Sequence, residues 1–158
     1  MAWPAFKNST NKMIREKSEI TQQYQSRVTP PVVDWLMPDE IFVFGSNAAG
    51  IHGAGAARTA LELFGAKHGE GIGFTGQCYA IPTKDRQIET LSLDIIEKYI
   101  DLFLHYVPHY STKTFLVTQI GCGLAGYTPE QIAPLFAKAV DLDNVHLPAE
   151  FWEVLNRN

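Results

Sequence analysis

Two glycine-rich stretches place backbone amides where they could hold an anion. The first covers residues 45–57 and contains four glycines and five alanines; the second covers residues 121–127. Glycine allows a ligand to approach the backbone closely. Each stretch runs into a predicted helix, whose first N–H groups and dipole favour negative charge. Two such turns in one domain could hold both phosphates of a pyrophosphate, although glycine-rich turns also serve packing alone.

Each stretch follows an apolar run that predicts a buried strand, at residues 41–44 and 114–120. The helix expected after the first turn covers residues 54–63, with Gly65 at its C-cap and Ala57, Ala60, Leu61 and Phe64 on its buried face. The helix expected after the second covers residues 129–140 and opens with a capping box of Thr128 and Gln131. Pro134 predicts a kink in it.

The remaining elements complete an alternation of strands and helices. We expect a strand at residues 77–82, a helix at 93–107 capped by Ser92, a strand at 144–147 and a helix at 148–155, with a surface loop at 69–76. This order predicts a three-layer α/β fold, a largely parallel mixed sheet with helices on both faces. Both glycine-rich stretches, and the charged residues 83–86, then fall at the carboxyl ends of strands, where such sheets bind ligands.

Composition limits the classes of function. The 158 residues suggest one domain at residues 30–158, preceded by a polar arm at 1–29, with a short helical turn at 32–36 that carries Trp35 toward the core. The net charge of −4 argues against extended nucleic-acid binding. No apolar run is long enough to span a membrane, and no signal peptide is evident, so we expect a cytoplasmic protein. Cys78 and Cys122 fit neither a disulfide framework nor a metal pattern, and the histidines show no ligand spacing, so no metal or cofactor is expected.

Four segments together resemble the macrodomains, which are ADP-ribose-binding α/β modules. They are residues 42–47, 52–57, 79–85 and 120–127, and the resemblance covers residues 39–140. It is to the branch that includes the terminal ADP-ribose protein glycohydrolase and to bacterial and phage macro-like proteins. It implies that the ligand is ADP-ribose or a close relative, free or carried by an ADP-ribosylated protein.

The resemblance also implies which residues bind the ligand. Asp39 or Glu40 would accept a hydrogen bond from the adenine amino group, and Tyr127 or Phe44 would stack on adenine, unless these rings belong to the core. Asn47 would lie near the distal ribose, or make only a local turn bond. The other implied ligand-binding residues are Gly45, Ser46, His52, Gly53, Ala54, Gly55, Ala56, Gly121, Cys122, Gly123, Leu124, Ala125 and Gly126.

The resemblance also implies catalytic candidates. Lys84 matches the catalytic lysine of the glycohydrolase branch, whereas Ala125 occupies the position of that branch's catalytic aspartate. Lys84 could attack the anomeric carbon, with Asp85 as general acid or base and Asn47 as a third candidate. Alternatively, the charged side chains of Lys84 and Asp85 could simply be solvated.

Two other side chains could take part in chemistry. His52 could contact phosphate or protonate a leaving group, or lie on the surface. Cys122 could be a thiolate nucleophile or a small filler.

Three functions therefore remain open: an ADP-ribosyl hydrolase, a non-catalytic ADP-ribose reader, or another nucleotide-dependent α/β enzyme. A dinucleotide-binding fingerprint would need a third glycine where Arg58 stands.

Overall fold

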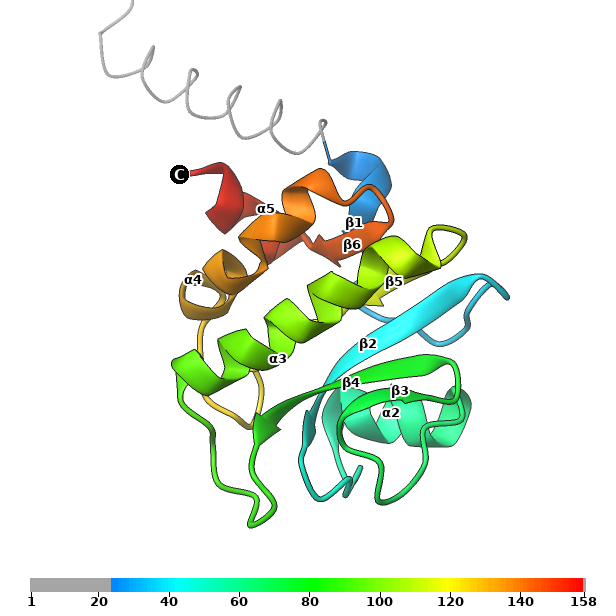
Figure 1. The fold of residues 1–158 in the computed structure, drawn as a ribbon, viewed down its shortest axis with the longest axis vertical. Helices are drawn as coiled ribbons and strands as arrows, with labels where there is room; N and C mark the ends of the chain where they lie inside the picture. Colours follow the sequence, from blue (N-terminus) through cyan, green and yellow to red (C-terminus); the bar gives the residue numbers. More distant parts are fainter. Residues whose placement is uncertain (1–23, 158) are drawn as a thin grey trace, which may run out of the picture.

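A six-stranded sheet in the order β1-β6-β5-β2-β4-β3 runs through the computed structural model, which describes residues 24–157 (Figure 1). Every neighbouring pair of strands is parallel except β3 and β4. The predicted α/β class and largely parallel mixed sheet are therefore confirmed. The strands are β1 (Val28–Thr29), β2 (Glu40–Asn47), β3 (Gly73–Thr75), β4 (Cys78–Lys84), β5 (Thr114–Val117) and β6 (Val145–Pro148).

Helices cover both faces of the sheet, as predicted (Figure 1). Successive side chains of a strand point to opposite faces. Accordingly, Ile41 and Val43 belong to a large core under α3, α5 and η3, whereas Phe42 and Phe44 belong to a smaller core under α2. The helices are α2 (Gly55–Leu63), α3 (Leu93–Tyr106), α4 (Pro129–Ile132) and α5 (Ala149–Asn156), and the 3-10 segments are η1 (Gln25–Arg27), η2 (Val107–Tyr110) and η3 (Ala133–Asp141).

Local signals located several helix ends correctly. Gly65 follows α2 with φ of 80°, and the Ala66 N–H closes the turn on the Ala60 carbonyl. Both halves of the capping box at Thr128 are present. The kink expected at Pro134 is found as a change from α4 to the 3-10 segment η3 at Ala133, because proline removes a donor from the helix ladder.

Other expectations were wrong. Residues 32–37 form no helix and Trp35 is 67% exposed, because Pro30 and Pro31 favour an extended chain. Leu61 is 38% exposed rather than buried on α2. The loop expected at residues 69–76 contains β3. The strand expected to end at Pro82 continues to Lys84. The pairing with β3 ends at Ala80, so the N–H that Pro82 lacks is not needed by that neighbour.

The segment from residue 24 to residue 29, counted with the polar arm in the sequence, forms η1 and β1 and joins the sheet beside β6. The Arg27 guanidinium donates hydrogen bonds to the carbonyls of Ala139, Val140, Leu142 and Val145 at 2.7–3.2 Å. It also lies 4.9 Å from the ring centre of Trp152, whose indole N–H donates to the Arg27 carbonyl at 2.8 Å. Arg27 therefore fastens β1 to the edge of the sheet. Residues 1–23 of the expected arm lie outside the described residues.

No helix within residues 24–157 has both the length and the apolar character needed to cross a membrane.

Candidate functional site

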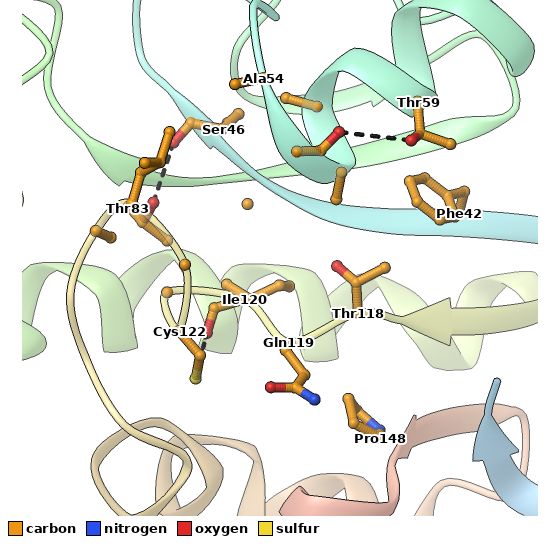
Figure 2. Close-up of a pocket in the computed structure, with 18 of the residues that line it drawn as sticks. Phe42, Ser46, Ala54, Thr59, Thr83, Thr118, Gln119, Ile120, Cys122 and Pro148 are labelled. Carbon is orange, nitrogen blue, oxygen red and sulfur yellow. Dashed lines mark hydrogen bonds between the residues drawn. The ribbon is translucent and has the colours of Figure 1, made fainter. Parts of the chain in front are cut away.

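A cleft of about 800 Å³ opens at the carboxyl ends of five parallel strands (Figure 2). Its walls come from residues in β1, β6, β2 and β4 and from the segments that follow β1, β6, β5, β2 and β4. Strands lie about 4.8 Å apart, so the cleft extends roughly 20 Å across the sheet. The volume is within the range of small-molecule sites.

Both glycine-rich turns line this cleft. In Figure 2, Ala54 of the first turn and Cys122 of the second lie on opposite sides of the opening. The turns converge where their strands end: a Cβ added to Gly45 would come within 3.6 Å of the Gly121 nitrogen. The two turns, which are about 70 positions apart in the sequence, therefore face one ligand space.

The first turn leaves a run of backbone amides without an acceptor. Helix α2 starts at Gly55 after Ala54, and no side chain caps it. Within the described part of the chain, the N–H groups of residues 53–57 have no hydrogen-bond partner. Unpaired amides at a helix N-terminus attract anions.

The second turn uses some of its amides internally and leaves others free. The Cys122 N–H bonds to the Gln119 carbonyl, and the Tyr127 N–H to the Gly121 carbonyl, at 3.1 and 2.9 Å. The N–H groups of Gly121 and of residues 123–125 find no acceptor among residues 24–157. Position 121 requires glycine, because the φ of Gly121 is 77° and a Cβ there would lie 2.8 Å from the Ile132 side chain.

Polar side chains gather near the ends of β2 and β4. The Thr83 hydroxyl donates to the Ser46 carbonyl (Figure 2). The Ser46 hydroxyl donates to the Gly71 carbonyl. The Asn47 side chain donates a hydrogen bond to the Ile51 carbonyl and accepts one from the Ile51 amide. These are the local turn bonds considered from the sequence. Lys84 lines the cleft and forms no ion pair with any residue that the structure describes.

Cys122 lines the cleft as a thiol, not as an activated nucleophile. Its Sγ lies 3.5 Å from the Ile120 carbonyl. Burial raises the pKa of Cys122 to about 11, and the negative charges of Glu130 and Glu150 add to the rise. The thiolate is therefore scarce at neutral pH, which favours the filler role over nucleophilic chemistry.

Several residues expected at the site lie elsewhere. His52 is 3% exposed, packs edge-on against Phe44 at 5.3 Å, and has Nε2 3.0 Å from the Lys67 carbonyl; it is neither a cleft residue nor a surface one. The Tyr127 hydroxyl donates to the Leu91 carbonyl, and its ring packs on the core. Phe44 is fully buried, so neither ring is placed to stack on a base.

The acidic candidates also lie outside the cleft wall. Asp39 and Glu40 stand at the amino end of β2, opposite the cleft, and Glu40 accepts a hydrogen bond from the Met37 amide. Asp85 accepts hydrogen bonds from the amides of its own turn. Gly126 does not line the cleft. The predicted site residues that do line it are Gly45, Ser46, Asn47, Gly53, Ala54, Gly55, Ala56, Lys84, Gly121, Cys122, Gly123, Leu124 and Ala125.

Three segments of the cleft wall were not predicted from the sequence. They are residues 28–33 within and after β1, residues 118–120 after β5, and residues 148–150 at the end of β6 and after it. The last two could have been found from the rule that was applied to the glycine turns, since they too follow carboxyl ends of parallel strands. Ile88, from the turn after β4, also lines the wall.

The chain matches no protein-family model, no curated protein and no solved structure in the three comparisons made. Within residues 24–157, no three His, Cys, Asp or Glu side chains are grouped so that they could hold a metal ion.

Proposed function

We propose that the cleft binds ADP-ribose or a close relative, free or attached to a protein. The observation that carries this proposal is the pair of glycine turns, which face one space with at least eight backbone amides unpaired within the described residues, those of residues 53–57 and 123–125. Amides from two turns suit two linked phosphates better than one, because each phosphate can then meet its own donors.

The two ends of the cleft suit the two ends of such a nucleotide. Near β1 and β6 the wall is apolar, formed by residues 30–33, Phe42 and Pro148, which fits a flat base. Glu150 lies beside it and could accept a hydrogen bond from an exocyclic amino group, the role that the sequence suggested for Asp39 or Glu40. Near β4 the wall carries Lys84 and Asn47, which fit the hydroxyl groups of a sugar.

Binding without turnover is the function that the side chains favour. Asp85 is engaged in its turn, Ala125 supplies no carboxylate, and the raised pKa of Cys122 disfavours a thiolate. Lys84 is the reactive group that remains in the cleft, so hydrolysis of an ADP-ribosyl bond through Lys84 is the second candidate.

Calorimetric titration with ADP-ribose, AMP and NAD tests the binding proposal. ADP-ribose should bind more tightly than AMP, which lacks the second phosphate and the distal ribose. Equal affinity for AMP and ADP-ribose, or no heat with either, would refute the two-turn site. A clear preference for NAD would favour the alternative of a nicotinamide-dependent enzyme.

Release of ADP-ribose from a modified protein separates the reader from the hydrolase. We expect no release by the wild-type chain. If release does occur, Lys84→Ala should abolish it, whereas Lys98→Ala, a lysine exposed on α3 away from the cleft, should not. Release that persists in Lys84→Ala would remove this lysine from the chemistry.

A further inference from the structure

The turn between β4 and α3 holds an isoleucine in a conformation that isoleucine rarely adopts. The Asp85 N–H donates to the Glu89 carbonyl at 2.8 Å and the Ile88 N–H to the Asp85 carbonyl at 3.1 Å, which closes a three-residue hairpin loop. Ile88, the last residue of that loop, has φ of 66°. Glycine usually fills this left-handed position, and a β-branched side chain there is strained.

The Asp85 carboxylate holds the turn in this shape. Its Oδ1 accepts hydrogen bonds from the amides of Gln87 at 2.9 Å and Glu89 at 3.0 Å, on either side of Ile88. The Thr90 hydroxyl then donates to the Ala125 carbonyl at 3.2 Å, which ties the turn to the second glycine-rich stretch. The turn is therefore fixed relative to the amides proposed to bind phosphate.

Ile88 lines the cleft and is 41% exposed, and Leu124 of the adjoining glycine turn lines it too and is 80% exposed. An exposed aliphatic side chain in a strained conformation lowers the stability of the empty protein. A ligand that covered Ile88 would recover the apolar burial. Strain retained at a cleft wall is typical of residues that contact a ligand.

We infer that Asp85 is a positioning residue that holds Ile88 against the ligand at the Lys84 end of the cleft, where Ile88 covers the C–H face of the sugar. This inference rests on the proposed function. It replaces the acid or base role considered for Asp85 with a structural one, because the carboxylate is engaged by backbone amides.

Titration of ADP-ribose into Ile88→Gly tests the contact. Glycine relieves the strain, so the melting temperature should stay within about 2 °C of wild type or rise. Affinity for ADP-ribose should fall roughly fivefold, the effect of losing the burial of the exposed two-fifths of an isoleucine. If Ile88 served folding alone, Ile88→Gly would not lower the affinity for ADP-ribose while leaving the melting temperature unchanged. Unchanged affinity would overturn the inference.

Two substitutions at Asp85 test how it acts. Asp85→Asn keeps the acceptor oxygen, so its affinity for ADP-ribose should stay near that of the wild type. Asp85→Ala should weaken binding about as much as Ile88→Gly does. The double variant Asp85→Ala with Ile88→Gly should bind no more weakly than either single variant, because both act through one contact. Additive losses, or an equal loss in Asp85→Asn, would overturn the positioning role. Absence of wild-type binding would instead refute the proposed function, and the ligand contact with it.

Discussion

A methyl group added at Gly123 would test the phosphate site with little effect on the fold. Gly123 lines the cleft, its φ lies outside the left-handed region, and a Cβ there would meet no protein atom within 4 Å. Alanine should therefore fit the folded chain. It should stabilise the fold by about 0.4–1 kcal/mol, because alanine restricts the unfolded chain more than glycine does.

The same methyl group should interfere with ligand binding. The amides of residues 123–125 have no acceptor within the described chain, so in the proposed complex they donate to phosphate. A hydrogen bond to a charged group contributes about 1.5–3 kcal/mol. If the methyl group pushes the phosphate away from one amide, affinity for ADP-ribose should fall roughly 10- to 150-fold.

Calorimetry with ADP-ribose and thermal unfolding of the same preparations provide the assay. Gly121→Ala serves as the contrast, because its φ of 77° and the 2.8 Å approach to Ile132 predict a loss of roughly 1–2 kcal/mol of stability. Gly123→Ala should thus lose affinity without losing stability, and Gly121→Ala should lose stability. Wild-type affinity in a well-folded Gly123→Ala variant would refute the idea that this turn holds phosphate.

Two further predictions concern the N-terminal edge of the sheet. Arg27→Met should lower the free energy of unfolding in urea by roughly 2–4 kcal/mol, because it leaves several backbone carbonyls without their charged donor. Arg58→Met, at an exposed arginine, is the control, and equal effects of the two substitutions would contradict the role of Arg27 in holding β1. His146 has a pKa lowered by burial and by the charge of Arg27, with Glu40 opposing, so below about pH 6.5 the unfolded state binds more protons than the folded one. Stability should therefore fall as the pH drops from 7 to 5, and His146→Gln should reduce that fall; parallel curves for the two proteins would contradict the assignment.

Elements with strong local signals were predictable from the sequence. The apolar run before Gly45, the capping box at Thr128 and the apolar stripe of α3 each act over a few neighbouring residues, and all three are found. The convergence of the glycine turns followed from the parallel order of the strands, since carboxyl ends of parallel strands share one edge.

Features that depend on distant contacts were not predictable. β1 has two residues, too few to show a periodic pattern, and it is held by Arg27 through carbonyls more than 110 positions away. A histidine inside a glycine-rich turn looks exposed, yet His52 is buried against Phe44 by the packing of β2. Asp85 carries the charge expected of a catalytic group, and only the turn geometry shows that backbone amides occupy it.

The position of β1 determines where this chain can be shortened. Cutting before Pro30, the start of the domain expected from the sequence, would remove β1 together with the Arg27 clamp and leave β6 as an uncovered sheet edge. An uncovered edge strand pairs readily with other chains, so the trimmed protein should tend to aggregate. It would also lack Val28 and Thr29, which line the end of the cleft that we propose for the base. Weak nucleotide binding by such a fragment would therefore not test the proposal for the full chain.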